Sequence, residues 1–331
     1  MSRCGAGSSR PRTLKEPNVL TFLMRRLVAG IVLVVAISFV AFALMYAGGA
    51  DIARSILGPE ATQDQVDAKA AELGIDQPLL VQYGEWFTHM IRGDFGRSWF
   101  TAESVTDAVV SRLGVTLSIV VVSLIAVAVI SVVLGVVAAI RRGWVDKVVQ
   151  VVSVVGVALP NFWVALVLVL TLAISIPLFP ATGYVQPKES VSGWLLSITL
   201  PVIAITIGGI AGAAQQIRGS VLDVSRQDFV RTLRSRGLPE RRVITNHILR
   251  NSLGPAMTVL SLQFIAMVGG SVVIEKVFAI PGLGMLALNA TLRGDIPIVM
   301  AVVMTMAVVV IVVNLLIDLV NGWASPKVRV Q

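Results

Sequence analysis

Residues 228–251 read DFVRTLRSRGLPERRVITNHILRN, and they lie between two long apolar runs. Eight arginines occur between residues 218 and 250, against three acidic residues. A segment this polar beside a membrane lies in water, and the positive-inside rule assigns its basic excess to the cytoplasmic side. We therefore predict that residues 215–252 form a cytoplasmic loop.

The internal pattern of this loop predicts a defined shape. Apolar residues recur at helical spacing at Leu222, Phe229, Val230 and Leu233. Gly237 stands where a helix ends, and Pro239 can open the next helix at its first position. We predict a short helix, a sharp turn and a second helix that serve as a docking element, because a solvated tether would need neither the apolar stripe nor this glycine and proline.

The chain as a whole is apolar enough to be a polytopic membrane protein. Of its 331 residues, 56% are hydrophobic and 14% charged. Several apolar runs reach about 20 residues, the length with which a helix crosses a bilayer. We predict an all-α fold with six transmembrane helices. Their expected ranges are Leu27–Tyr46, Val115–Ile140, Val148–Ile176, Leu195–Ala214, Ala256–Val277 and Ile298–Asn321.

The charges predict the orientation and the division of the chain. The segments placed inside carry 19 Lys and Arg against 6 Asp and Glu, and those outside carry 8 against 13. The net charge of +8 therefore records orientation, with both termini cytoplasmic, rather than nucleic-acid binding. The predicted parts are a flexible cytoplasmic tail (1–20), a first transmembrane helix (21–47), an extracytoplasmic helical loop (48–114), a five-helix core (115–322) and a second cytoplasmic tail (323–331).

The extracytoplasmic loop is predicted to contain two helices of its own. Thr62 and Gln65 form a capping-box pattern that opens a helix to Leu73, and Gly74 can close it. A second helix opens at Pro78 and ends by Gly93, with an apolar stripe of Leu79, Tyr83, Trp86, Phe87, Met90 and Ile91. The stripe packs on the spans or in the headgroup region, or the loop forms part of a landing surface for an external partner; the two are compatible.

The chain lacks the residue patterns of membrane-embedded catalysis. Cys4 is the only cysteine, and His89 and His247 both lie outside the predicted spans. No HExxH, paired aspartate or GxxxxGK[ST] sequence occurs. We therefore predict no catalytic site, no metal site and no cofactor on this chain. The spans also hold too few ionisable residues for an ion-coupled transporter, so a partner must supply the energy.

Two amide side chains are candidates for a translocation path. Asn161, beside Pro160, and Gln263 lie within predicted spans, where a polar side chain faces an aqueous path or a neighbouring helix; both alternatives stay open.

Small residues such as Gly208, Gly209 and Gly212 indicate close helix packing. Pro160 is expected to kink the third span. A turn is predicted at Pro281, Gly282 and Gly284, and Asp318, in register with Asn314 and Asn321, is expected to bond a neighbouring helix.

Three stretches of sequence carry a family resemblance. DFVRTLRSRGLPERRVITNHILRNSLGP (228–255) resembles the conserved cytoplasmic loop of binding-protein-dependent ABC importer permeases, with Gly237 as its central glycine. Leu73–Trp99 and Glu275–Ala290 resemble the B-type permease of oligopeptide and dipeptide importers. The resemblance covers nearly everything after residue 20. The EAA triplet typical of this loop is replaced by Arg231, Thr232 and Leu233, so the glycine and the two-helix shape carry the match.

The resemblance implies a type I ABC importer permease in the plasma or inner membrane. It implies as partners a second, C-type permease, two cytosolic ATPase subunits or one fused ATPase that bind ATP and Mg, an extracytoplasmic substrate-binding protein, membrane lipids and a peptide substrate. The loop would dock on the ATPase through Phe229, Leu233 and Leu238 as apolar anchors. Its polar contacts would come from Asp228, Arg231, Arg234, Arg236, Arg241 and Arg242 around Gly237.

Other functions remain compatible with the sequence. Nickel and glutathione importers share this permease pattern. An ion-coupled transporter or channel would act without ATPase partners, and a membrane scaffold subunit would bind partners but move nothing.

Overall fold

The computed structural model describes residues 19–46, 49–141 and 143–324. Within them the chain is helical, without strands, as predicted. The helices are α1 (Val19–Tyr46), α2 (Gly49–Leu57), α3 (Gln63–Leu73), α4 (Leu79–Ile91), α5 (Val105–Ile140), α6 (Trp144–Ala158), α7 (Asn161–Leu168), the π-helix η1 (Val169–Ser175), α8 (Val191–Ser225), α9 (Asp228–Ser235), α10 (Glu240–Arg242), the π-helix η2 (Val243–Ile248), α11 (Leu249–Val277), α12 (Leu283–Arg293) and α13 (Ile296–Ala324). Cys4 and all but two residues of each predicted tail lie outside the described residues.

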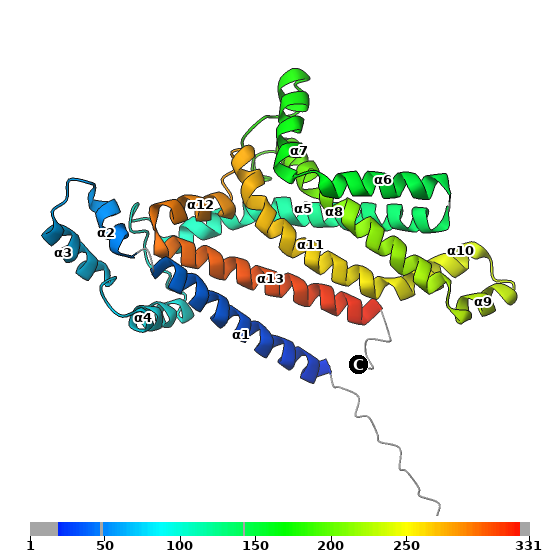
Figure 1. Ribbon diagram of the computed structural model, residues 1–331, viewed down its shortest axis with the longest axis horizontal. Coiled ribbons are helices and arrows are strands. Elements are labelled where there is room, and N and C mark those ends of the chain that lie inside the picture. The colour runs from blue at the N-terminus through cyan, green and yellow to red at the C-terminus, as the bar shows by residue number, and fades with distance from the viewer. Residues whose placement is uncertain (1–18, 47–48, 142, 325–331) are drawn as a thin grey trace, which may run out of the picture.

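Five of the described helices are long and apolar enough to cross a membrane, and one bent pair of helices makes a sixth if the pair counts as a single span (Figure 1). The pair is the predicted third span, in which α6 and α7 meet at an angle of 95°. Leu159 is extended, with ψ 122°, because a residue before proline is disfavoured in the helical region, and Pro160 has no N–H to continue the ladder. The predicted kink at Pro160 is confirmed, and it amounts to a break.

Several helices extend beyond the predicted spans. α5 begins at Val105 rather than at residue 115, because Ser104 caps it by accepting a bond from the Asp107 N–H at 3.4 Å. α8 continues to Ser225, so the first part of the predicted loop 215–252 is helical. An apolar run marks only the part of a helix that lies in lipid, whereas capping residues set where the helix ends.

The core lies where α5, α8 and α11 meet, around the fully buried Ile119, Leu200 and Phe264. Glycines let α5 and α6 approach α8 closely, since a Cβ at Gly135 would lie 2.8 Å from the carbonyl oxygen of Ala214 and one at Gly156 would lie 2.9 Å from the Ala211 Cβ. Membrane helices associate through such contacts because lipid provides little hydrophobic drive.

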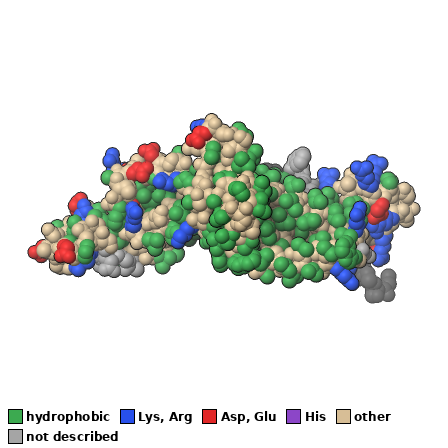
Figure 2. All heavy atoms as spheres, turned by 90° about the horizontal axis from the view of Figure 1, so that it is seen from above, with side chains coloured by type: hydrophobic (Ala, Val, Ile, Leu, Met, Phe, Trp, Pro, Cys, Tyr) green, Lys and Arg blue, Asp and Glu red, His purple; other side chains and the backbone are tan. Residues whose placement is uncertain are grey.

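The two ends of the bundle differ in charge. Figure 2 shows Lys and Arg side chains at the end that carries α9 and α10, acidic and basic side chains together at the opposite end, and hydrophobic side chains between them. Near the basic end, Arg218 of α8 donates from Nη2 to Asp146 Oδ2 of α6 at 2.6 Å. Arg26 of α1 pairs with Asp318 of α13, so Asp318 bonds a neighbouring helix as predicted.

Candidate functional site

The loop between α8 and α11 has the predicted shape. α9 ends at a turn in which Gly237 has φ +78° and donates its N–H to the Arg234 carbonyl at 2.9 Å. The Leu238 N–H donates to the Leu233 carbonyl at 3.4 Å, and the two bonds together form a Schellman motif. Pro239 is the N-cap residue of α10, with ψ 137°. It was predicted at the first position of this helix, so the helix begins one residue later than predicted.

The loop is anchored to the bundle by its own small core. Val230 and Val243 are fully buried and Ile248 nearly so, packed against residues of α8 that include Ile217 and Val221. The loop therefore shares a packed core with α8 and α11. The predicted apolar anchors Phe229, Leu233 and Leu238 lie half-buried at the edge of this cluster, where each still presents apolar surface.

The polar side chains of the loop face outward. Arg234 forms a bidentate pair with Glu240 across the turn, with Nε–Oε2 at 3.0 Å and Nη2–Oε1 at 2.6 Å. The Arg234 guanidinium lowers the pKa of Glu240 below its ordinary range, and the carboxylate raises the pKa of Arg234. Asp228 lies 3.7 Å from Arg231, and both are exposed. The other exposed cations of the predicted set are Arg236, Arg241 and Arg242.

Asn161 and Gln263 both face the glycine-rich stretch Gly208–Gly212 of α8. Gln263 donates from Nε2 to the Gly209 carbonyl at 2.9 Å. A Cβ at Gly208 would lie 3.4 Å from Asn161 Oδ1. Asn161 is half-buried at the break of the third span and has no hydrogen-bond partner among the described residues. The two amides thus come from different helices to one wall of the bundle.

The end of the bundle opposite α9 and α10, called the outer end after its predicted side, holds a buried polar network that sequence reasoning missed. Glu275 is 0% exposed. Its Oε1 accepts from Thr116 Oγ1 at 2.7 Å and its Oε2 from the Met285 N–H at 2.9 Å. Thr116 Oγ1 in turn accepts from the Leu283 N–H at 2.8 Å. The carboxylate therefore caps the N-terminus of α12, where an anion is favoured.

Gly282 and Gly284 make room for this carboxylate. A Cβ at Gly284 would lie 2.8 Å from Glu275 Oε2, and one at Gly282 would overlap the carboxylate itself. The outer turn predicted at Pro281, Gly282 and Gly284 is confirmed. The sequence signal for the missed network was Glu275, an acidic residue at the end of an apolar run. A short turn follows it, and the next helix then begins with the sequence Gly-Leu-Gly.

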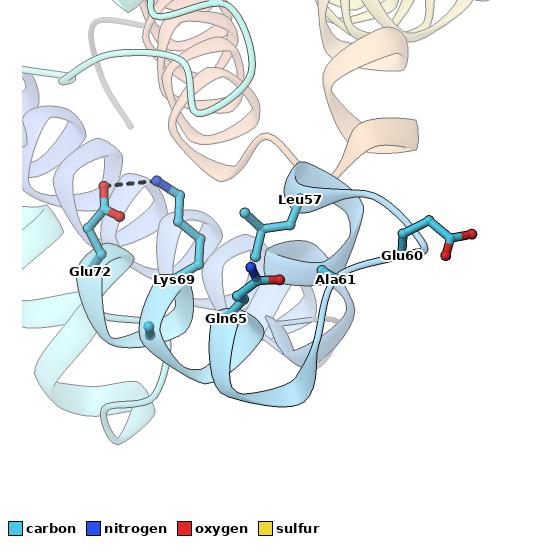
Figure 3. Close-up of a pocket in the computed structure, with 7 residues that line it drawn as sticks. Leu57, Glu60, Ala61, Gln65, Lys69 and Glu72 are labelled. Atoms are coloured by element: carbon cyan, nitrogen blue, oxygen red, sulfur yellow. Dashed lines mark hydrogen bonds and ion pairs between the residues drawn. The ribbon is translucent and has the colours of Figure 1, made fainter.

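The outer lobe formed by α2, α3 and α4 packs on α1. Tyr83 and Trp86 of the predicted stripe lie against Phe42, with ring centroids 5.7 and 5.9 Å apart, whereas Ile91 is exposed. The predicted capping box is confirmed, since the Thr62 N–H donates to Gln65 Oε1 at 3.0 Å. An open depression between α2 and α3 is lined by Leu57, Glu60, Ala61, Gln65, Ala68, Lys69 and Glu72 (Figure 3).

Metal-binding residues do not cluster in the part of the chain that the structure describes, where no group of three or more His, Cys, Asp or Glu side chains is suitably placed.

Two family descriptions match most of the sequence. The binding-protein-dependent transport system inner membrane component matches residues 131–330, and the N-terminal part of such a membrane component matches residues 19–120. The chain belongs to this family. It is a multi-pass membrane protein, and the family implies in general a partner permease, ATPase subunits and a substrate-binding protein.

Relatives match over nearly their whole length. A putative peptide transport system permease of Brucella abortus is 35% identical over 93% of this chain and 98% of its own. The oligopeptide transport system permease AppB of Bacillus subtilis is 32% identical over 93% and 99%. The metal-staphylopine import system permease CntB of Staphylococcus aureus is 32% identical over 93% and 98%. The family resemblance of the three sequence stretches is thereby confirmed.

Proposed function

We propose that this chain is the B-type permease subunit of an ATP-driven importer of oligopeptides or dipeptides. It forms half of the translocation path and couples to cytosolic ATPase subunits through the loop around Gly237. The observation that carries the coupling role is the shape of this loop: α9, the Gly237 turn and α10 project basic side chains outward while Val230 and Val243 are buried against α8.

The loop suits the transmission of force because its two helices are held against each other and because the loop is packed on the spans. The Gly237 turn and the Arg234–Glu240 pair fix α9 against α10. The shared core with α8 and α11 then transfers any displacement of the loop to two spans. Closure of an ATPase pair on ATP would rock these spans as rigid bodies.

The test is a pair of substitutions at Gly237. Gly237→Val places a β-branched residue at a positive φ, which costs about 1–2 kcal/mol or more and distorts the turn. We expect peptide uptake and peptide-stimulated ATP hydrolysis to fall together while membrane insertion stays normal. Gly237→Asn is the matched control, since asparagine tolerates this conformation. Unchanged uptake and ATP hydrolysis in the valine variant would show that the loop is a tether.

The orientation and the partners follow from the same proposal. Both termini are cytoplasmic, and the complete importer adds a C-type permease, two ATPase subunits or one fused ATPase that bind ATP and Mg, and an external binding protein that lands on the outer lobe. In a variant without Cys4, a cysteine replacing exposed Gln65 should label from outside intact cells, and one replacing exposed Ser235 should not. Labelling at position 235 would invert the orientation.

Asn161 and Gln263 are proposed to line the path at the break of the third span. Their separate replacement by leucine should slow uptake with little loss of thermal stability if the amides face the substrate. A purely packing role would instead cost about 0.6 kcal/mol, rarely above about 1.7 kcal/mol, with normal transport. Gln263 already bonds the Gly209 carbonyl, so the contrast should be clearer for Asn161.

A metal-chelate importer is the second candidate, because the S. aureus relative is named for metal-staphylopine import. The same permease role in a nickel or a glutathione importer is a further alternative. Uptake assays of the complete transporter with labelled peptide, nickel and glutathione separate these substrates. An ion-coupled transporter would take up substrate without ATPase partners, and a scaffold subunit would support no uptake.

A further inference from the structure

The outer lobe is connected to the spans by two routes. α4 packs on α1, where Tyr83 OH and Ser38 Oγ lie 2.9 Å apart. Residues 92–104 form the second route, which leads from α4 into α5. The routes reach different parts of the bundle, since α1 packs on α13 whereas α5 packs on α8 and α11. The second route therefore leads directly to the helices of the core.

The second route is a folded turn and not a slack linker. Arg97 and Ser104 form an antiparallel bridge. The Ser98 N–H donates to the Glu103 carbonyl at 3.0 Å, and Ser98 Oγ accepts from the Thr101 N–H, also at 3.0 Å. These bonds satisfy polar groups of the segment itself, so it holds a defined shape. We call residues 97–104 the Ser98 turn.

The Ser98 turn is bonded to a buried carboxylate. Ser98 and Asp295 are 4% and 3% exposed. Ser98 Oγ donates to Asp295 Oδ2 at 2.5 Å, and the Trp99 N–H donates to Asp295 Oδ1 at 3.3 Å. Burying a carboxylate is costly unless it is hydrogen-bonded, so the pairing favours this one arrangement. The carboxylate therefore fixes the position of the turn.

Asp295 belongs to the corner between α12 and α13. Its N–H donates to the Ala290 carbonyl at 2.9 Å, and its carbonyl accepts from the Val299 N–H at 3.1 Å. Ile52 of the outer lobe packs against the same corner, where a Cβ at Gly294 would lie 2.9 Å from Ile52 Cγ1. Figure 1 shows the lobe beside this corner. The lobe, the Ser98 turn and the corner therefore meet at one point.

The corner is in turn packed on α5. Val105, the first residue of α5, is fully buried in a cluster with Ala290 of α12 and Val299 of α13. The other end of α12 is tied to α5 through Glu275, which caps α12 and accepts from Thr116 of α5. Since α12 is held at both ends, a force on the Ser98 turn acts on α5 and α13.

We propose that Asp295 is a positioning residue that couples the outer lobe to α5 and α13, so that the landing of the binding protein on the lobe is passed to the spans. The proposal rests on the proposed function, which supplies the binding protein and the ATPase subunits. Coupling between two sites needs a structural element that both sites act on. The bonds of Asp295 provide one, because they join the connection of the lobe to two spans at a single buried group.

The experiment compares ATP hydrolysis by the complete transporter in proteoliposomes with and without its binding protein, loaded with a peptide digest of casein. In Asp295→Ala we expect the stimulation by the binding protein to fall by about fivefold or more, as for a typical coupling between sites. Hydrolysis without the binding protein, and the Kd of the binding protein, should stay as in the wild type. Asp295→Asn, which keeps one acceptor oxygen, should show the same change to a smaller extent.

Tyr83→Phe is the matched control. It removes the hydroxyl that bonds Ser38 and weakens the attachment of the lobe to α1, while the bonds of Asp295 stay intact. We expect this variant to keep the full stimulation. An equal loss of stimulation in Tyr83→Phe and Asp295→Ala would show that any loosening of the lobe has this effect, which contradicts a specific role of Asp295.

A double-mutant cycle tests whether Ser98 and Asp295 act as one contact. Ser98→Ala removes the hydroxyl donor and should lower the stimulation, as Asp295→Ala does. In the double variant the stimulation should fall no further than in Asp295→Ala, because residues in contact do not contribute independently. Effects that multiply would exclude this contact as the coupling element.

The outcomes separate this inference from the function on which it rests. A wild-type transporter that responds to the binding protein, with Asp295 variants that respond equally, overturns the role of Asp295 alone. A proportional fall of basal and stimulated hydrolysis assigns Asp295 to the stability of the fold, and a weaker Kd assigns it to the shape of the landing surface; either result overturns the coupling. A wild-type transporter that does not respond to its binding protein overturns the proposed function and this inference together.

Discussion

The two ends of this protein each depend on glycine, for opposite physical reasons. At the outer end, a Cβ at Gly284 would lie 2.7 Å from the Val272 Cα, so glycine is needed for space. At the end that carries α9 and α10, called the inner end after its predicted side, nothing among the described residues lies within 4 Å of a Cβ at Gly237, and glycine is needed for its φ of +78°. The outer turn is determined by what packs around it, and the inner turn by its own backbone.

The polar groups of the two ends show a similar contrast: those of one end bond within the chain, and most of those at the other end are exposed. Glu275 and Thr116 bond to each other and to the amides of α12, so the outer network is closed within the chain. Arg236, Arg241 and Arg242 of the inner loop are exposed, whereas Arg234 pairs with Glu240 and Arg231 makes a long contact with Asp228. A closed network stabilises one arrangement of the fold, whereas an open basic surface is available to a partner.

The largest effect is expected at the buried carboxylate. Glu275→Ala leaves the Thr116 hydroxyl and the Met285 N–H without their acceptor, at about 1–3 kcal/mol for each unsatisfied group. We expect a clear drop in the thermal stability of the purified protein. Glu85→Ala, at an exposed carboxylate of the outer lobe, should change stability by no more than about 0.5 kcal/mol. Equal effects would mean that the Glu275 network does not stabilise the outer end.

Separate substitutions at Gly284 and Gly237 are expected to have an effect of intermediate size on stability. Gly284→Ala forces a methyl group against Val272 and should cost about 1–3 kcal/mol. Gly237→Asn adds a side chain where the structure leaves open space, and asparagine tolerates this φ. Its cost in stability should therefore be roughly a few tenths of the cost of Gly284→Ala. Thermal unfolding of both variants measures the difference. If Gly237→Asn destabilises the protein as much as Gly284→Ala, the inner turn is also set by packing.

The smallest effect is expected from acid at the inner turn. The pKa of Glu240 is lowered in the folded loop, so its pairing with Arg234 stabilises the turn above the ordinary pKa of 4.5 and is lost as pH falls through the lower, folded value. Both side chains are about half exposed, so the contribution is about 0.2–1 kcal/mol and weakens with salt.

Hydrogen exchange of the α9 and α10 amides, corrected for intrinsic rates, measures this loss. Glu240→Gln should remove the acid dependence, and the amides of α5 around Val127, in a stretch without titratable side chains, serve as the internal reference. Protection of α9 and α10 that falls with acid in the glutamine variant as in the wild type would assign the effect to another group.

Local patterns predicted local features correctly. The Gly237 turn, the capping box at Thr62 and the break at Pro160 each depend on residues within one or two turns of helix, and the structure has all three. The Glu275 network was not predictable in this way, because Thr116 is 159 residues away from Glu275. The angle of 95° at Pro160 was also beyond the sequence, since proline permits a break but the packing of Val164 and Ala165 sets its direction.

The sequence by itself determined that this protein is an all-α, multi-pass membrane protein with a shaped basic loop, because apolar run length, charge and glycine–proline patterns act through local conformation and solvent. Only the tertiary structure decided which residues meet. It brought Asn161 and Gln263 to one wall of α8, buried Glu275 at the start of α12 and bent α7 away from the direction of α6. Such contacts join distant segments, and they are fixed by the packing of whole helices and not by any one stretch of chain.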